Sequence, residues 1–250
     1  MHRFNNQIAI VTGGASGIGL GIVRRLTREG AHVAIFDQDE AAMARVVSAF
    51  KSDEMEVSTY AVDITSEASV KKAIDDVVDR FGKLDVMVNC AGVVGPSSTK
   101  ILDYDAEAFR KVVDINLTGS FIMTKYAIEP MLKQSYGRIL LIASIGGKEG
   151  NPGMAGYAAS KSGVMGLVKG IGKEYAGTGV TVNGLAPAVI RTPMNEDTAP
   201  EMLAYMTSKI PMGRLGTVEE TAAISCWIVS EEASFNTGFV FDLSGGRATF

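Results

Sequence analysis

Short apolar runs alternate along the chain with longer segments in which apolar residues recur at helical spacing. The runs with the length of strands are Gln7–Thr12, Ala31–Phe36, Val57–Val62, Leu84–Asn89, Ile139–Ala143, Val180–Leu185 and Phe239–Asp242. Most of them are apolar throughout, which is typical of strands covered on both faces. The pattern therefore predicts an α/β fold with a doubly wound, mostly parallel sheet and helices on both faces.

The length of the chain fits one domain. It has 250 residues, 46% of them hydrophobic, which is enough for a large core. No linker, repeat or low-complexity tract divides it, so we expect residues 1–250 to form a single domain.

A glycine-rich turn follows the first predicted strand. Gly13, Gly17 and Gly19 are spaced as G-x-x-x-G-x-G, and a helix with apolar periodicity continues through Leu26. Glycines let the backbone approach a pyrophosphate closely, and the amides at a helix N-terminus attract its negative charge. The strand, turn and helix together predict a dinucleotide-binding unit.

The second predicted strand is followed by an acidic residue, Asp37. A carboxylate at this distance from a glycine turn can accept hydrogen bonds from the hydroxyls of an adenosine ribose. It would repel the 2′-phosphate of NADP, and the turn carries Ala15-Ser16 where a phosphate site would need Arg or Lys. The sequence therefore favours NAD as the cofactor.

Tyr157 and Lys161 are separated by one helical turn in Tyr-Ala-Ala-Ser-Lys. Because residues i and i+4 share a helix face, the Lys161 ammonium is expected to lower the pKa of the Tyr157 phenol and fit it for proton transfer. Ser144 follows an apolar strand, at the end where open α/β sheets bind ligands. The two histidines, His2 and His32, lack a convincing catalytic context, and no His–Cys cluster predicts a metal site.

These motifs occur in a fixed order: the glycine turn, Asn89-Cys-Ala-Gly92, Ser144 and Tyr157-x-x-x-Lys161. Together they resemble the short-chain dehydrogenase/reductase family, and the resemblance covers essentially the whole chain. It implies a Rossmann-like fold and an oxidoreductase that uses NAD to interconvert a secondary alcohol and a ketone.

The resemblance also implies catalytic roles. Tyr157 is expected to be the acid/base, and Lys161 to lower its pKa and bind the nicotinamide ribose. Ser144 is expected to orient the substrate oxygen. Asn116 is expected to support a water-mediated proton relay; it lies in a predicted apolar helix, where an amide is costly unless it is hydrogen-bonded.

Further cofactor contacts follow from the same resemblance. Asp63 is expected beside the adenine, and the Pro187–Thr192 segment near the nicotinamide. Cys90 and Ala188 depart from the usual Asn and Gly, and the Ala188 methyl could shift the backbone near the reactive face. The cofactor residues so predicted are Gly13, Ser16, Gly17, Ile18, Gly19, Asp37, Asp63, Ile64, Asn89, Ala91, Gly92, Tyr157, Lys161, Pro187, Ile190 and Thr192.

The segments Gly146–Pro152 and Ala186–Thr192 are similar to the branch of the family that acts on 2-keto-3-deoxy sugar acids, including the fuconate and rhamnonate 4-dehydrogenases. Such substrates carry a carboxylate and several hydroxyls, which basic and polar side chains can bind. Lys148 and Arg191 are expected to bind the carboxylate, and Glu149 and Asn151 the hydroxyls, beside Ser144 at the reacting oxygen.

Other activities stay open. A 3-oxoacyl carrier-protein reductase is common on this scaffold, although Asp37 disfavours its usual NADPH. A steroid or other hydrophobic-alcohol dehydrogenase would use Met202, Met206 and Met212, in a predicted lid at about residues 194–214, as an apolar wall. A third alternative is an NAD-binding regulatory protein without turnover.

Charge and targeting signals narrow the partners. A net charge of −4 gives no basic field for nucleic acid. The start of the chain has no signal-peptide core and no stretch has transmembrane length. Two scattered cysteines fit a reducing compartment, so we expect a cytoplasmic protein without membrane partners.

We expect a homotetramer, because apolar-rich segments resemble the assembly surfaces of the family. These segments are Phe109–Met131, Met154–Tyr175 and Phe239–Phe250. The apolar chain end, Phe250, is expected to reach a neighbouring subunit's site.

Overall fold

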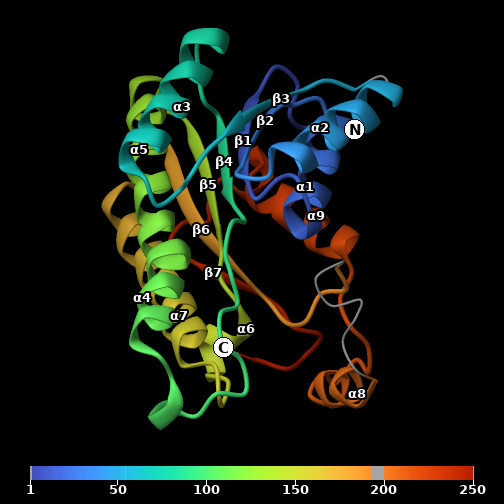
Figure 1. The fold of residues 1–250 in the computed structure, drawn as a ribbon. Coiled ribbons are helices and arrows are strands. Elements are labelled where there is room, and N and C mark those ends of the chain that lie inside the picture. The colour runs from blue at the N-terminus through green and yellow to red at the C-terminus, as the bar shows by residue number, and fades with distance from the viewer. Residues whose placement is uncertain (1, 54, 193–199, 250) are drawn as a thin grey trace.

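The computed structural model describes residues 2–53, 55–192 and 200–249. Figure 1 shows a central sheet between two layers of helices. All its strands are parallel, in the order β3-β2-β1-β4-β5-β6-β7. Their bounds are β1 Ile8–Thr12, β2 His32–Asp37, β3 Val57–Ala61, β4 Val86–Asn89, β5 Gly137–Ile142, β6 Val180–Pro187 and β7 Val240–Leu243. Each predicted apolar run overlaps one of these strands, and the predicted fold class is confirmed.

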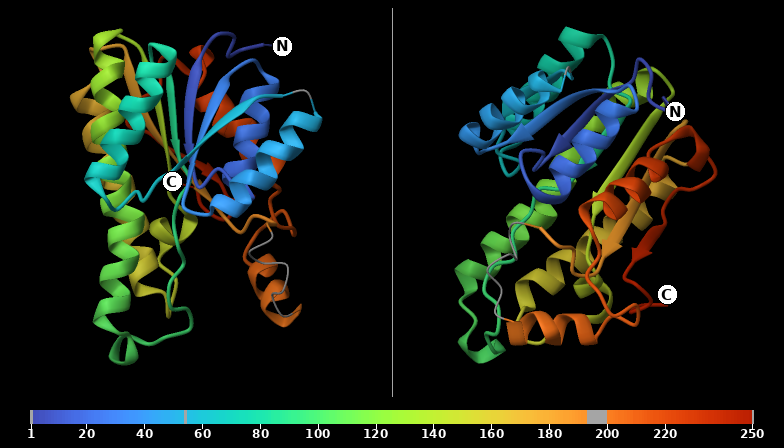
Figure 2. Two further views of the ribbon diagram at one scale, coloured as in Figure 1. Left: turned by 45° about the horizontal axis from the view of Figure 1, so that its top comes forward. Right: turned by 90° about the vertical axis from the view of Figure 1, so that its right-hand side faces the viewer.

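Helices complete the two outer layers. The α-helices are α1 Gly17–Arg28, α2 Glu40–Ser52, α3 Glu67–Phe81, α4 Ala106–Val113, α5 Gly119–Lys133, α6 Ile145–Glu149, α7 Ala155–Glu174, α8 Pro200–Ser208 and α9 Val218–Ile228. Short 3₁₀ turns occupy Ile101–Asp103 and Glu231–Ala233. Figure 2 shows α8 standing away from the sheet.

Both faces of the sheet are apolar because successive side chains of a strand point to opposite faces. In β5, Leu140 packs into the core formed with α1, α2 and α9, whereas Leu141 packs into the core formed with α3, α5 and α7. This double burial explains why the strands read as continuous apolar runs.

The chain between α4 and α5 does not continue as a regular α-helix. Asp114–Thr118 forms a π-helical turn, and Asn116 lies inside it with 0% exposure. The predicted helix through this segment is present, and it contains a π turn that the sequence pattern does not indicate. A π turn adds one residue to a helical turn, and apolar periodicity does not reveal such an insertion.

The sheet places its binding edge at a switch in strand order. From β1 the chain proceeds outward to β2 and β3 on one side of the sheet, and from β4 to β5, β6 and β7 on the other. The loops that follow β1 and β4 therefore diverge and leave a crevice at the carboxyl ends of these two strands. Residues 194–199 of the predicted lid, and Phe250, lie outside the described residues.

Within residues 2–53, 55–192 and 200–249, no helix is long and apolar enough to cross a membrane. The same residues contain no group of three or more His, Cys, Asp or Glu side chains that could hold a metal.

Candidate active site

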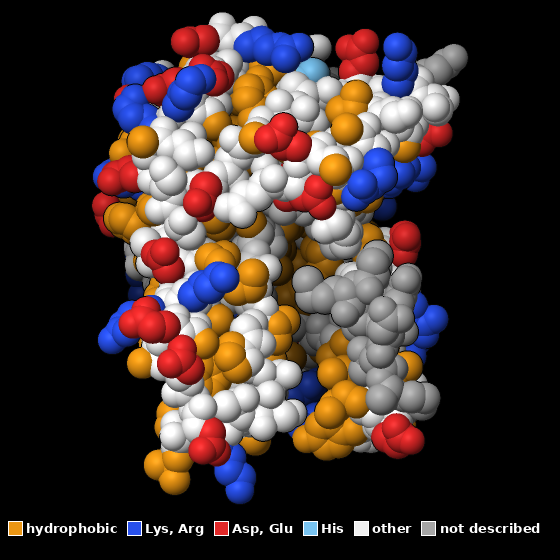
Figure 3. Space-filling view, in the orientation of Figure 1, with side chains coloured by type: hydrophobic (Ala, Val, Ile, Leu, Met, Phe, Trp, Pro, Cys, Tyr) orange, Lys and Arg blue, Asp and Glu red, His pale blue; other side chains and the backbone are white. Residues whose placement is uncertain are grey.

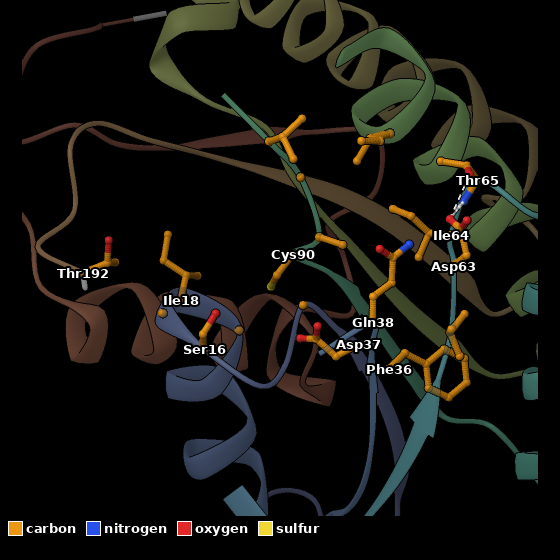
Figure 4. A pocket seen from close by; sticks show the side chains of 18 residues that line it. Ser16, Ile18, Phe36, Asp37, Gln38, Asp63, Ile64, Thr65, Cys90 and Thr192 are labelled. Atoms are coloured by element: carbon orange, nitrogen blue, oxygen red, sulfur yellow. Dashed lines mark hydrogen bonds between the residues drawn. The ribbon is translucent and has the colours of Figure 1, made fainter. Parts of the chain in front are cut away.

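A cavity of about 420 Å³ opens at the carboxyl ends of β1, β2 and β4 (Figure 4). It gathers most of the residues predicted to bind the cofactor. The lining residues are Gly13, Ser16, Gly17, Ile18, Gly19, Phe36, Asp37, Gln38, Val62, Asp63, Ile64, Thr65, Cys90, Ala91, Gly92, Val93, Ile115 and Thr192.

The glycine turn forms one wall of this cavity, and its backbone needs glycine. Gly13 and Gly17 have φ angles of +60° and +50°, which side chains disfavour. A Cβ on Gly19 would lie 2.1 Å from the Gly13 carbonyl oxygen. Ser16 precedes α1 but makes no side-chain cap hydrogen bond, so this hydroxyl does not compete for the first amides of the helix.

Two carboxylates also line the cavity, and one of them is bonded to the glycine turn. Asp37 accepts hydrogen bonds from the Ala15 amide at 3.1 Å and the Asp39 amide at 3.1 Å. Asp63 accepts from the amide and hydroxyl of Thr65, at 2.9 and 2.8 Å. A carboxylate has about four acceptor positions, so each side chain keeps acceptor capacity toward a ligand.

Asn89 does not line the cavity, but its side chain connects the elements that surround it. Its Oδ1 accepts from the Thr12 hydroxyl at 2.6 Å, and its Nδ2 donates to the Ser120 hydroxyl at 2.9 Å. Thr12 also accepts from the Ala91 amide at 3.0 Å. These bonds join β1, β4 and α5. The sequence analysis missed Thr12 and Ser120, because isolated hydroxyl residues carry no motif.

Asn116 fixes the loop after β4 against α7. Its Oδ1 accepts from the Val93 amide at 2.8 Å, and its Nδ2 donates to the Val93 carbonyl at 2.9 Å and the Ser160 hydroxyl at 3.0 Å. The Asn116 carbonyl in turn accepts from the Ser120 hydroxyl at 2.6 Å. The expected hydrogen-bonding need of this buried amide is thus met.

Tyr157 and Lys161 share one side of α7, as predicted from their spacing. The Lys161 Nζ donates to the Ile142 carbonyl at 2.8 Å and lies 5.9 Å from the centre of the Tyr157 ring. Lys161 also approaches the cofactor cavity, since a Cβ on Gly92 would lie 3.4 Å from Nζ.

The pKa values of this pair correct one expectation. Burial lowers the pKa of Lys161 to about 8. Burial raises the pKa of Tyr157 and outweighs the opposing effect of its hydrogen bond with Ser144. The predicted lowering of the Tyr157 pKa by Lys161 is therefore not what this structure gives. Desolvation disfavours the charged form of each group, phenolate and ammonium alike.

Three side chains surround one point beside Gly146, at the start of α6. This point is the position that a Cβ would take if residue 146 had a side chain. From it, Asn151 Nδ2 lies at 2.9 Å, Tyr157 Cε1 at 3.4 Å and Ser144 Oγ at 3.5 Å. Ser144 is the N-cap of α6 and accepts from the Gly146 amide at 3.1 Å. The predicted Ser144 and Tyr157 are thus brought together with Asn151.

Lys148 and Glu149 form ion pairs with the C-terminal part of the chain. Lys148 Nζ lies 3.1 Å from an oxygen of Asp242 in β7, and its side chain is 7% exposed. Arg247 donates to Glu149 Oε2 from Nε at 2.9 Å and from Nη2 at 2.7 Å. The sequence analysis missed Asp242 and Arg247, because these partners are 94 and 98 residues away.

The segment after β6 reaches the cavity through Thr192. Its side chain lies 3.8 Å from the Cβ position of Gly17, whereas Pro187 and Ile190 are buried outside the lining. Arg191 is exposed and does not line the cavity either. Figure 3 shows a hollow between the surfaces over α4 and α8.

Comparisons with known proteins agree with this fold. A family model described as enoyl-(acyl carrier protein) reductase matches residues 13–248. A 2-dehydro-3-deoxy-L-rhamnonate dehydrogenase (NAD(+)) of Sphingomonas sp. (strain SKA58) is 42% identical over 99% of this chain and 98% of its own. A 3-oxoacyl-[acyl-carrier-protein] reductase of Thermotoga maritima is 35% identical over 98% of each chain.

A solved structure of NAD⁺-bound xylitol dehydrogenase superimposes with a TM-score of 0.92, covering 98% of this chain and 100% of that one at 30% identity. The chain belongs to the short-chain dehydrogenase/reductase family. It is an oxidoreductase of the kind that acts on a CH–OH group.

Proposed function

We propose that the protein is an NAD-dependent dehydrogenase that oxidises the 4-hydroxyl of a 2-keto-3-deoxy sugar acid. The observation that carries this proposal is the convergence of Ser144, Asn151 and Tyr157 beside Gly146. An acid/base, a hydroxyl and an amide donor can there hold one secondary alcohol among other hydroxyls. The likeness to the Sphingomonas enzyme supports the sugar-acid substrate.

The residues of the cavity fit NAD. The glycine turn and the start of α1 would hold the pyrophosphate, and a Cβ at Gly19 would force this turn apart by clashing with the Gly13 carbonyl. Asp37 would accept from the adenosine ribose, and Asp63 would lie near the adenine. Bound NAD supplies the acceptor for the hydride that leaves the carbinol carbon.

Side chains of the protein itself would transfer the proton of the alcohol. Tyr157 takes the proton of the alcohol O–H as its phenolate, while the Ser144 hydroxyl holds the same oxygen. Lys161 Nζ, which lies beside Gly92 of the cavity, would bind the nicotinamide ribose. Asn116 connects the loop after β4 to α7, the helix that carries Tyr157 and Lys161, through Val93 and Ser160.

A second candidate is reduction of a 3-oxoacyl thioester. It is favoured by the Thermotoga relative and by the description of the matching family model. Asp37 opposes it, since a carboxylate at the ribose repels the 2′-phosphate of the usual NADPH.

The test is NADH formation by the purified protein with a panel of sugar acids, acyl alcohols and steroids, each with NAD or NADP. We expect turnover of 2-keto-3-deoxy-L-rhamnonate or -fuconate with NAD. Tyr157→Phe should lower kcat by about 10²–10⁴-fold, the contribution of a general acid/base, with NAD binding retained. Unchanged turnover in this variant would remove Tyr157 from the mechanism. NADPH-dependent reduction of oxoacyl thioesters alone would instead favour the second candidate.

We also propose a homotetramer in the cytoplasm. Phe109, Phe121 and Phe239 are exposed on α4, on α5 and beside β7, where a second copy of the chain could cover them. Both cysteines are free, which supports a reducing compartment. Light scattering should give four times the chain mass of 26.4 kDa, and a monomer would contradict the tetramer.

A further inference from the structure

We propose that Arg247 is a positioning residue of the substrate site, which fixes the Asn151 carboxamide so that Nδ2 points toward the substrate oxygen held by Ser144 and Tyr157. The proposal rests on the proposed function, because it assigns a role in binding the substrate of that site. Arg247 lies in the segment after β7 and has no catalytic motif around it.

Arg247 is anchored before it reaches Asn151. Its Nε and Nη2 both donate to Glu149 Oε2, at 2.9 and 2.7 Å. The Arg247 side chain is 8% exposed. A planar guanidinium held through two of its nitrogens has little freedom to rotate, so its remaining contacts are fixed in direction.

The guanidinium determines which end of the Asn151 amide faces it. Arginine has donors and no acceptor, so only the Oδ1 atom of Asn151 can bond to it, and Nη2 lies 3.5 Å from Oδ1. The Nδ2 donor must then face the other way. There it lies 2.9 Å from the Cβ position of Gly146, near Tyr157 Cε1 and Ser144 Oγ.

The C-terminal segment that carries Arg247 has its own internal support. Asp242 Oδ1 accepts from the amide and hydroxyl of Ser244, and the Ser244 hydroxyl accepts from the Ala248 amide at 3.0 Å. The other Asp242 oxygen pairs with Lys148. Two ion pairs therefore connect this part of the chain to α6, one between Asp242 and Lys148 and one between Arg247 and Glu149.

Loss of Arg247 should consequently release the Asn151 amide. Without a donor beside Oδ1, the amide can rotate and present either oxygen or nitrogen to the substrate. The proton-transfer residues Tyr157 and Ser144 keep their own contacts. The effect should thus appear in the KM of the alcohol much more than in kcat or in the KM of NAD.

The experiment is a double-mutant cycle with the intact protein and 2-keto-3-deoxy-L-rhamnonate as the probe. Arg247→Ala should raise the KM for this alcohol about tenfold, as expected for loss of one directed hydrogen bond to substrate. Asn151→Ala should do the same. The KM of the double variant for the alcohol should stay within about twofold of the KM of Asn151→Ala, because Arg247 acts through Asn151. The KM for NAD should change by less than about twofold.

Two outcomes would overturn the proposal. In one, the two tenfold increases in the KM for the alcohol multiply, so that the KM of the double variant is about a hundredfold above that of the wild type. In the other, Arg247→Ala leaves the KM for the alcohol unchanged or raises the KM for NAD equally. Arg3→Ala is the matched control, since it removes another arginine–glutamate pair, with Glu29, whose side chains are 14% and 9% exposed. Its KM values should be those of the wild type even where its stability falls.

Failure of this proposal can be told apart from failure of the proposed function. If wild-type protein does not turn over the probe, or Tyr157→Phe turns it over at the wild-type rate, the proposed function fails and this inference falls with it. If Tyr157→Phe abolishes turnover but Arg247→Ala has a normal KM, only the role of Arg247 is wrong.

Discussion

The two ends of the site are held together in different ways. At the cofactor end, backbone atoms pack against backbone atoms, as where a Cβ on Gly19 would meet the Gly13 carbonyl. At the substrate end, charged side chains on α6 pair with Asp242 and Arg247, which lie 94 and 98 residues further along the chain. Backbone contacts leave no room for substitution, whereas side-chain pairs can be exchanged one at a time. We therefore expect substitutions to be tolerated better around α6 than in the glycine turn.

Lys161, where the two ends meet, gives the largest expected effect on stability. Its folded pKa of about 8 lies below the ordinary 10.5. Between about pH 8 and pH 10.5, Lys161 carries its proton more often in the unfolded chain than in the folded chain. Its contribution therefore makes the free energy of unfolding rise with pH. Below about pH 8 both states carry the proton, and the full cost of burying the ammonium is present, roughly 3 kcal/mol at most.

The measurement compares Lys161→Met with wild type in urea unfolding on both sides of this pH window. Any advantage of the variant below the window should shrink as pH rises through it. The variant also leaves the Ile142 carbonyl without its donor, a loss that does not change with pH. A difference in unfolding free energy that stays constant with pH would mean that Lys161 is not a buried cation.

Gly19→Ala sharpens the comparison at the cofactor end. The new methyl would lie 2.1 Å from a backbone oxygen, so the turn must shift, at a cost of about 2 kcal/mol. The dissociation constant for NADH should rise about thirtyfold. Gly177→Ala is the control, because no atom lies within 4 Å of its Cβ position. Equal NADH binding by both variants would show that the tight turn is not required.

The same division explains what the sequence could predict. The glycine turn, Asp37 and the Tyr157–Lys161 spacing are local patterns. The structure places the first two in the lining of the cavity and the last pair on one side of α7. The ion pairs of Lys148 and Glu149 join distant segments, so no local pattern contains them. The same residues were predicted to bind substrate, because a charged loop next to Ser144 does not reveal its own partners.

Two further misses have local physical causes. The π turn around Asn116 changes a helix by one residue, which leaves the apolar pattern readable as a regular helix. The pKa of Tyr157 depends on burial as well as on Lys161, and the i, i+4 spacing contains only the second effect. The catalytic and cofactor roles of the residues stay predictions until variants are measured.

Asp37→Asn gives the smallest expected effect and could break the comparison. Asp37 acts through side-chain charge, although it belongs to the cofactor end. The amide keeps an acceptor for Ala15 but loses the charge that faces the ribose, so the preference for NAD over NADP should fall about tenfold. Asp39→Asn is the control, because Asp39 caps α2 by accepting from the Ala42 amide at 2.8 Å and does not line the cavity. The ratio of kcat/KM with NAD and NADP measures both variants. An unchanged ratio in Asp37→Asn would mean that backbone shape alone selects the cofactor, and a changed ratio would mean that the cofactor end also contains a single exchangeable charge.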